Sequence, residues 1–350
     1  MTTIDVNTEG RPAREVLAWS RMVVEPALRA AVHRLPASML RIAGYHFGWW
    51  NEAGQQYHAA DSTHGGKAIR PALVLLSAQA VGGVPAAAVP AAVAVELVHN
   101  FSLLHDDVMD GDVTRRHRPT AWSVFGPNAA ILAGDALLTL ALDELAASGH
   151  PVATDGIRML SATVQNLVAG QNADLAFEQR TEIALADCLW MAERKTGALI
   201  GCACAMGACF GGGSPEQVAA LRGFGQHLGL AFQHVDDLLG IWGDPAVTGK
   251  SVYSDLRSRK KSLPVVAALT SDTPAGDELA TLYHRDAALS ETDLVHAADL
   301  IAIAGGRAWN QAQIDDLLAR AMRELQAARP AQQAAGELGA LARLATHRDH

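Results

Sequence analysis

The stretch Glu96–Arg116, ELVHNFSLLHDDVMDGDVTRR, decides how this chain folds. Its apolar side chains recur near helical spacing, which predicts a helix that ends in a group of acidic residues. Three aspartates in the spacing DDxxD and two arginines form this end: Asp106, Asp107, Asp110, Arg115 and Arg116. Such a concentration of charge at the end of an apolar helix requires a physical explanation.

The spacing of the aspartates favours a metal site. On a helix Asp106 and Asp110 lie one turn apart on the same face, and Asp107 sits about 100° further round. Carboxylates this close repel each other unless they share divalent cations, and Mg²⁺ prefers such oxygens together with water and phosphate. The arginine forks suit phosphate oxygens. The local hypothesis is a metal-bridged diphosphate site, and a solvated acidic helix end is the alternative.

The whole chain has the composition of a compact enzyme-sized protein. It contains 350 residues, 49% of them hydrophobic, and its formal net charge is −9. The negative charge argues against nucleic-acid binding, because that role normally shows a basic face. The N-terminal sequence has no apolar core of signal-peptide length, which predicts a cytoplasmic protein. The apolar run at 198–210 is too short to span a bilayer, so we expect no stable membrane insertion.

Alanine-rich segments with helical periodicity fill most of the chain, and no period-2 stretch of strand length recurs. The sequence therefore predicts an all-α fold, a single large helical bundle around a central cavity. Residues 1–20 are expected to form a flexible N-terminal arm, and residues 21–350 the bundle domain. The expected helices cover 23–40, 71–81, 86–110, 127–147, 158–176, 185–210, 215–239 and 263–269, with two or three weaker helices after them.

Four cysteines in a chain of this length do not indicate a disulfide framework. Cys202, Cys204 and Cys209 lie among Ala and Gly in the run ALIGCACAMGACF. Their spacing is not that of a standard zinc site. We expect small buried residues at a tight helix crossing.

Charged residues elsewhere in the chain suit the same chemistry. In GGKAIRP, Lys67 and Arg70 stand at the start of an expected helix, and a helix N-terminus favours anions. Asp236 and Asp237 end another helix, in AFQHVDDLLG. If this helix faces the first acidic helix in a bundle, both acid pairs meet at one end of the cavity. The acid pair that begins at Asp315 lacks a third carboxylate and nearby phosphate binders, and we interpret it as a solvated surface.

Seven motifs occur in an order that resembles the trans-isoprenyl diphosphate synthases, or polyprenyl synthetases. They are GGKAIRP, ELVHNFSLLHDDVMDGDVTRRHRPT, ILAGDALL, GQNADL, KTGALI, FQHVDDLLG and GDPAVTGK followed by SDLRSRKKSLPV, between about Gly65 and Leu269. The resemblance implies the isoprenoid synthase fold and a homodimer. It also implies a Mg²⁺-dependent prenyltransferase that condenses isopentenyl diphosphate with dimethylallyl, geranyl or farnesyl diphosphate.

The resemblance implies a role for each matching side chain. The ligands expected for three Mg²⁺ ions are Asp106, Asp107, Asp110, Asp236 and Asp237. The head group of isopentenyl diphosphate matches Lys67, Arg70, His99 and Arg116, and the allylic diphosphate matches Arg115, Lys195 and Lys250. The reacting carbons match Thr196, Gln233 and Gln171. Those expected to act in catalysis are Lys195, Thr196, Gln233, Asp106 and Asp107.

The chain departs from the family pattern in three places. Gly240 replaces the usual third aspartate of the second motif, which should weaken the third metal site or shift its load to Asp237, water or Asp244. Ala68 stands where a basic residue is common. Tyr253 replaces a residue that is often small, and the sequence assigns it no role.

The length of the product is expected to depend on the helix before the first motif. Phe101 lies five residues before Asp106, and Ser102 four before. An aromatic residue followed by a small one resembles the archaeal-type synthases that stop at C20. We therefore expect geranylgeranyl diphosphate, with a C15 product as the rival and with Phe101 as the floor of the tunnel. The alternative is that Phe101 is only a core residue.

Two other functions stay open at this point. A class I terpene cyclase also uses DDxxD and Mg²⁺, but it normally carries an Asn/Asp, Ser and Glu triad, and FQHVDDLLG offers no Ser or Glu at that spacing. A regulatory subunit of a heteromeric synthase is expected to lose metal ligands, whereas the first motif is intact.

Overall fold

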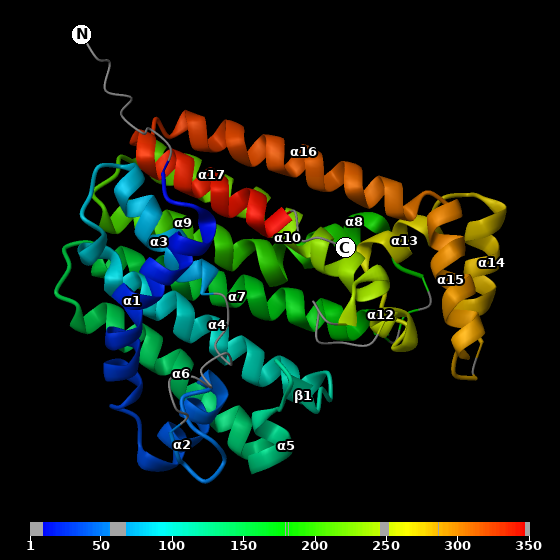
Figure 1. Cartoon of the computed structure of the whole chain (residues 1–350), viewed down its shortest axis with the longest axis horizontal. Helices are drawn as coiled ribbons and strands as arrows, with labels where there is room; N and C mark the ends of the chain where they lie inside the picture. The colour runs from blue at the N-terminus through cyan, green and yellow to red at the C-terminus, as the bar shows by residue number, and fades with distance from the viewer. Residues whose placement is uncertain are drawn as a thin grey trace. The chain divides into compact units, whose positions relative to one another are not determined.

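A computed structural model describes residues 10–56, 68–178, 180, 182–245, 252–285 and 287–346 (Figure 1). The expected site residues Lys67 and Lys250 lie outside this part of the chain. The described residues are mostly helical, and their one sheet is a hairpin of two short strands. The predicted all-α class is therefore confirmed. The chain divides into two compact units.

Unit 1 comprises Met1–Ala162, Cys202–Arg222 and Leu325–Leu341. Its elements are α1 (Ala13–Val32), α2 (Ala37–Phe47), α3 (Ile69–Ala80), the 3₁₀ turn η2 (Pro85–Ala88), α4 (Val89–Met109), β1 (Thr114–Arg115), β2 (Arg118–Pro119), α5 (Ala121–Phe125) and α6 (Pro127–Ala147).

Helix α4 is the central helix of unit 1, in contact with α1, α3 and α6. It is apolar on nearly all sides, and Val93, Leu97 and Leu104 are fully buried. Among the described residues, Pro85–Met109 is the one helical stretch long and apolar enough to cross a membrane, and 67% of the apolar window is buried in the protein. Core helices pass the same test, and the burial of α4 places it with them.

Unit 2 comprises Thr163–Gly201, Gly223–Glu324 and Ala342–His350. Its own elements are α8 (Leu185–Ala192), the π-helical turn η3 (Glu193–Gly197), α12 (Ser254–Arg257), α13 (Leu263–Leu269), α14 (Pro274–Tyr283) and α15 (Glu291–Ile303). The helices that have residues in both units are α7 (Ala153–Glu178), α9 (Ala198–Phe210), α10 (Pro215–Trp242), α16 (Gly306–Ala327) and α17 (Gln332–Thr346).

The ends of several helices differ from the prediction. Helix α1 already includes residues 13–20, which were expected to belong to a flexible arm, because Val16 and Ser20 are buried. The single helix expected over 23–40 is wrong. Helix α1 ends at Val32 and α2 starts after Pro36, whose ring fixes φ at −53° and whose nitrogen has no proton to continue a helix. Four helices, α14 to α17, follow residue 269 instead of two or three.

The tight helix crossing expected around the cysteines is confirmed. Cys202 and Cys204 on α9 are free and buried. Gly207 on the same helix lies so close to α3 that a Cβ atom there would collide with the carbonyl oxygen of Val74. The small residues of this run therefore serve close packing.

Candidate active site

The first aspartate motif forms the C-terminal end of α4. Asp107 is 1% exposed, whereas Asp106 is partly exposed and Asp110 is exposed. Asp106 and Asp110 therefore share the open side of the helix, one turn apart, as the spacing predicts. Asp107 lies on the buried side and has a different role.

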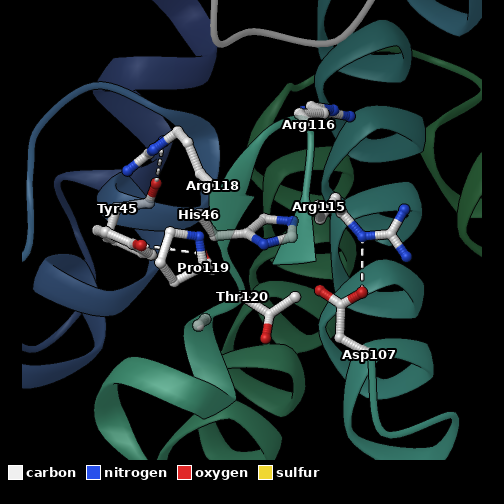
Figure 2. A pocket seen from close by; sticks show the side chains of 9 residues that line it. Tyr45, His46, Asp107, Arg115, Arg116, Arg118, Pro119 and Thr120 are labelled. Atoms are coloured by element: carbon white, nitrogen blue, oxygen red, sulfur yellow. Dashed lines mark hydrogen bonds and ion pairs between the residues drawn. The ribbon is translucent and has the colours of Figure 1, made fainter. Parts of the chain in front are cut away.

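That role is a contact with the hairpin. Nε of Arg115 donates to Oδ1 of Asp107 at 2.6 Å (Figure 2). The other oxygen, Oδ2, is buried and has no hydrogen-bond partner among the described residues. Burial raises the pKa of Asp107 to about 6, although the charge of Arg115 lowers it.

The donor set fits Mg²⁺ bound together with substrate. The orphaned oxygen of Asp107 costs about 1–3 kcal/mol unless a donor or a cation reaches it. No group of three or more His, Cys, Asp or Glu side chains forms a ready metal site in the part of the chain that the structure describes. Mg²⁺ often takes only one or two carboxylates and completes its shell with water and phosphate, which agrees with this arrangement.

The hairpin that carries the arginines has an unusual turn. Arg115 pairs with Arg118 across the two strands, so Arg116 and His117 alone form the turn. Their φ angles are +52° and +60°, as a type I′ turn requires. Residues other than glycine are strained in this region, by about 1–2 kcal/mol each. This backbone strain lies in the turn that carries Arg116, a residue that lines the pocket.

Helix α2 fixes the second strand of the hairpin. The guanidinium of Arg118 lies 4.4 Å from the centroid of the Tyr45 ring, and the Tyr45 hydroxyl donates to the Pro119 carbonyl at 2.9 Å. Figure 2 marks the hydrogen bond from Tyr45 to Pro119, and a further one from Arg118 to the Tyr45 carbonyl, beside a pocket. The residues that line this pocket are Tyr45, His46, Asp107, Arg115, Arg116, Arg118, Pro119, Thr120 and Ala121.

His46 is a polar group of this pocket that no motif indicated. Figure 2 shows its ring between Arg118 and Arg115. Burial and the charges of the neighbouring arginines lower the pKa of His46 to about 3, while a hydrogen bond to Asn100 opposes them. The imidazole is therefore neutral at physiological pH.

Three polar residues, Glu96, His99 and Asn100, interrupt the apolar sequence of α4. Nδ2 of Asn100 donates to Glu96 at its carbonyl oxygen, 2.8 Å, and at Oε1, 3.1 Å. Nη1 of Arg70 lies 3.2 Å from Nε2 of His99. Burial, followed by Arg70 and Arg116, lowers the pKa of His99 well below its usual value. Nε2 of its neutral ring can therefore accept a hydrogen bond from Arg70.

These groups have an excess of positive charge. Burial raises the pKa of Glu96, and the charges of Arg70 and Arg116 oppose this shift. The charges of three arginines, Arg70, Arg116 and Arg21, thus act on one carboxylate. The remaining charge is suited to an anion with several oxygens, such as a diphosphate.

In unit 2, two expected residues lie in the π-helical turn η3, which interrupts the helix predicted over 185–210. Such turns are rare and often occur at functional sites. Nζ of Lys195 lies 2.5 Å from Oδ2 of Asp174, and Oγ1 of Thr196 donates to Oε1 of Gln233 at 2.6 Å. Gly170 on α7 allows the backbone of η3 to lie close to it, because a Cβ at residue 170 would lie 2.5 Å from the backbone nitrogen of Lys195.

In the second acid pair, as in the first motif, one aspartate is buried and the other is partly exposed. Asp237 is 3% exposed, and its two oxygens accept from Gln233 Nε2 at 2.8 Å and from the Leu263 amide at 2.9 Å. Burial raises the pKa of Asp237 to about 7, against the charge of Lys260. Asp237 therefore orients Gln233 and the start of α13, and Asp236 is the more open residue of the pair.

The expected residues that the structure describes are divided between the two units. In unit 1 they are Arg70, His99, Asp106, Asp107, Asp110, Arg115 and Arg116; in unit 2 they are Gln171, Lys195, Thr196, Gln233, Asp236 and Asp237. Direct contacts join Arg70 to His99, Asp107 to Arg115, Thr196 to Gln233 and Gln233 to Asp237. Phe101 is 6% exposed, and its ring packs edge-on against His105 with centroids 4.8 Å apart. The sequence missed His46 and Arg118, which act through α2 and follow no spacing rule.

Comparisons with known proteins identify the family of this chain. The family model described as polyprenyl synthetase matches residues 54–301. A (2E,6E)-farnesyl diphosphate synthase of Mycobacterium tuberculosis is 46% identical over 301 residues, 85% of this chain and 83% of the relative. A geranylgeranyl diphosphate synthase of the same species is 48% identical over 294 residues, 84% and 83% of the two chains. The crystal structure of a polyprenyl synthetase from Streptomyces coelicolor A3(2) has a TM-score of 0.90 at 45% identity and covers 95% of this chain and 98% of its own. This chain belongs to the polyprenyl synthetase family.

Proposed function

We propose that this protein condenses isopentenyl diphosphate with an allylic diphosphate and forms geranylgeranyl diphosphate. The observation that carries the proposal is the basic group of Arg70, His99 and Arg116 in the same unit as the DDxxD motif. An enzyme that uses one diphosphate has no need of this second set of phosphate binders. A synthase that joins two diphosphates needs both.

The reaction breaks the allylic carbon–oxygen bond, and both electrons leave with the diphosphate. Mg²⁺ would supply positive charge that stabilises this leaving group, and the carboxylates proposed to hold it are Asp106 and Asp110 in unit 1 and Asp236 in unit 2. Arg115, positioned by Asp107, adds fixed positive charge in unit 1, and Lys195, positioned by Asp174, does so in unit 2.

The carbon–carbon bond then forms. The double bond of isopentenyl diphosphate attacks the allylic cation, and a proton leaves the adjacent carbon for the departed diphosphate. The hydrogen bond from Thr196 to Gln233 holds two side-chain dipoles in one orientation, which suits stabilisation of the cation. Asp237 holds Gln233 from its other end.

The product assignment is C20, with C15 as the rival. The two mycobacterial relatives have nearly equal identity to this chain, and one is a farnesyl and the other a geranylgeranyl diphosphate synthase. The buried position of Phe101 supports its role as a floor five residues below the first aspartate. Three Mg²⁺ ions, a homodimer and a cytoplasmic location complete the proposal.

The experiment is incubation of the purified protein with Mg²⁺, isopentenyl diphosphate and, in turn, dimethylallyl, geranyl and farnesyl diphosphate. We expect linear C20 diphosphate from each allylic substrate. Cyclic hydrocarbons without consumption of isopentenyl diphosphate would show a terpene cyclase. Turnover that requires a second protein would show a regulatory subunit.

A further inference from the structure

Gly240 lies on α10 four residues after Asp236, where the family pattern has a third carboxylate. Residues four apart on a helix are neighbours on one face, and their side chains lean toward the N-terminus of the helix. A side chain at position 240 would therefore reach toward Asp236. Glycine provides none.

A carboxylate from another element fills this space. A Cβ built on Gly240 would lie 2.7 Å from Oδ1 of Asp255 and closer still to its Cγ and Oδ2. The hydroxyl of Ser254 donates to the Gly240 carbonyl at 3.3 Å, so α12 is attached to α10 at this point. The Asp255 carboxylate thus occupies the place of a residue-240 side chain.

The backbone around α12 keeps Asp255 there. Tyr253 before the helix and Arg259 after it have φ angles of +62° and +52°. Such strain persists only when the surrounding structure enforces it. Leu256 is fully buried, and the amide of Lys260 donates to the Asp255 carbonyl at 2.8 Å. Tyr253, which had no role in the sequence, begins this turn.

We propose that Asp255 supplies the third carboxylate of the second aspartate motif, in place of the side chain that Gly240 lacks. The inference rests on the proposed function, since the metal and the diphosphate belong to that reaction. Asp237 does not fill the role, because both its oxygens accept hydrogen bonds from the protein. Oδ1 of Asp255 accepts a hydrogen bond from the Ser254 hydroxyl at 3.4 Å, and the carboxylate stands where a side chain at position 240 would lie, on the helix face of Asp236. Its hard oxygen atoms suit Mg²⁺.

A second observation points to a ligand at this place. The hydroxyl of Tyr283 is buried, the residue being 8% exposed, and it has no hydrogen-bond partner among the described residues. Burial raises the pKa of this phenol, and the nearby charge of Asp255 adds to the shift. A buried donor beside the carboxylate suits an oxygen of metal-bound water or of diphosphate.

The test measures metal binding directly. Mn²⁺ replaces Mg²⁺ as a spectroscopic probe, and its binding is followed by electron paramagnetic resonance in the presence of inorganic diphosphate. Asp255→Asn keeps the volume and removes the charge, and Gly240→Ala adds a methyl group that displaces the carboxylate. We expect each to weaken the Mn²⁺ site by about tenfold or more. Asp315→Asn on the surface of α16 is the matched control and should bind like the wild type.

A residue swap sharpens the test. Gly240→Asp alone places two carboxylates in one space and should weaken binding, whereas Gly240→Asp with Asp255→Ala should return it close to the wild-type value. Unchanged binding by Asp255→Asn, or the same loss caused by Asp244→Asn instead, would overturn the inference. Thermal unfolding without metal checks that each variant is folded.

Substrate turnover separates this inference from the proposed function. If the wild type forms no elongated product while Asp255→Asn still loses Mn²⁺, the proposed reaction is wrong and the metal role of Asp255 stands. If the wild type elongates its substrate and Asp255→Asn binds Mn²⁺ normally, only the role of Asp255 is wrong.

Discussion

Glu96 places one negative charge among the arginines of the candidate diphosphate site. Arg70 and Arg116 repel each other, and the buried Glu96 carboxylate, which attracts both, offsets part of that repulsion. Asn100 donates one hydrogen bond to this carboxylate, at Oε1, and another to the backbone carbonyl of Glu96. The position of the two guanidinium groups therefore depends on a residue that we do not expect to touch the reacting carbons.

Glu96→Gln should accordingly affect one substrate more than the other. The amide keeps the shape of Glu96 and removes its charge, so the arginines lose their common partner. We expect the KM for isopentenyl diphosphate to rise by about tenfold, with a smaller change in kcat and in the KM of the allylic substrate. Glu25→Gln on α1 is the control. A tenfold fall in kcat, with the KM values of both substrates unchanged, would contradict this role.

His46 makes the free energy of unfolding depend on pH. Its folded pKa is lowered to about 3, so the fold favours the neutral ring. The stabilisation is complete above the ordinary histidine range and is lost as the pH falls from about 6.5 toward 3. His46→Gln should remove this dependence, which amounts to about 2–3 kcal/mol at pH 4.5.

Chemical denaturation at several pH values measures this difference. The variant should lose less stability than the wild type between pH 7 and 4.5. His284→Gln, an exposed histidine after α14, should behave like the wild type. Parallel curves for wild type and His46→Gln would show that the ring is not held neutral.

The residues of the site differ in how far the sequence predicted them. Asp106 and Asp110 share a face because the helix period alone dictates it. The separate role of Asp107 depends on Arg115, which reaches it from a hairpin that no strand pattern indicated. His46 acts on Asn100 and the arginines across more than fifty residues, and such contacts leave no local spacing to read.

At the scale of elements, the hairpin β1–β2 stores backbone strain. His117 is exposed and has a φ of +60°, which glycine adopts without cost. We expect His117→Gly to stabilise the protein by about 1 kcal/mol and to raise Tm by about 2 °C in thermal unfolding. His284→Gly, at a φ of −89°, lacks this benefit and serves as the control. A lower Tm for His117→Gly would mean that the side chain holds the turn.

Helix α4 carries the expected determinant of product length. Phe101 and His105 pack edge-on, and Gly134 on α6 leaves room for the His105 ring, since a Cβ there would collide with it. Phe101→Ala should open this layer and give products longer than C20, as measured by chromatography of the dephosphorylated prenols. The cavity left by this substitution should lower the free energy of unfolding by about 3–5 kcal/mol, so the assay should be run at low temperature.

A matched variant controls for that loss of stability. Phe47→Ala removes a buried ring from α2, which stacks on Trp49, whereas Phe101 packs on His105. Its products should keep the wild-type length. Unchanged products from Phe101→Ala would show that this ring is only part of the core.

The elements were predictable where one physical pattern dominates. Alanine-rich periodicity predicted α3, α6 and α13 to within two residues at each end. It did not predict the π-helical turn at Lys195, because an extra residue in one turn leaves the apolar pattern almost unchanged. The strained turn at Arg116 was missed for a similar reason, since arginine and histidine are not turn formers.

At the scale of the whole molecule, composition predicted the all-α fold class but not the division of the chain into two units. Unit 1 comprises three separate segments of the chain, and unit 2 comprises the two segments between them together with the last segment, Ala342–His350. This arrangement depends on packing between helices far apart in sequence. A flexible arm at 1–20 was expected because its first residues are polar, while the contacts that hold Arg11 are made by Glu337 near the other end.

The pair Arg11–Glu337 therefore joins the two ends of unit 1. Glu337 is fully buried and accepts from the Arg11 amide at 3.1 Å, from Nε at 2.8 Å and from Nη2 at 2.7 Å. Burial opposes the charged form, yet the hydrogen bonds from Arg11 keep the pKa of Glu337 below its usual value, so the pair loses its contribution as pH falls. Glu337→Gln should destabilise the protein by about 2–3 kcal/mol in urea and speed amide exchange in α1. Glu291→Gln, in an exposed ion pair with Arg257, should change neither the stability nor the amide exchange. Equal effects of the two variants would show that the buried ion pair does not hold the two ends of unit 1 together.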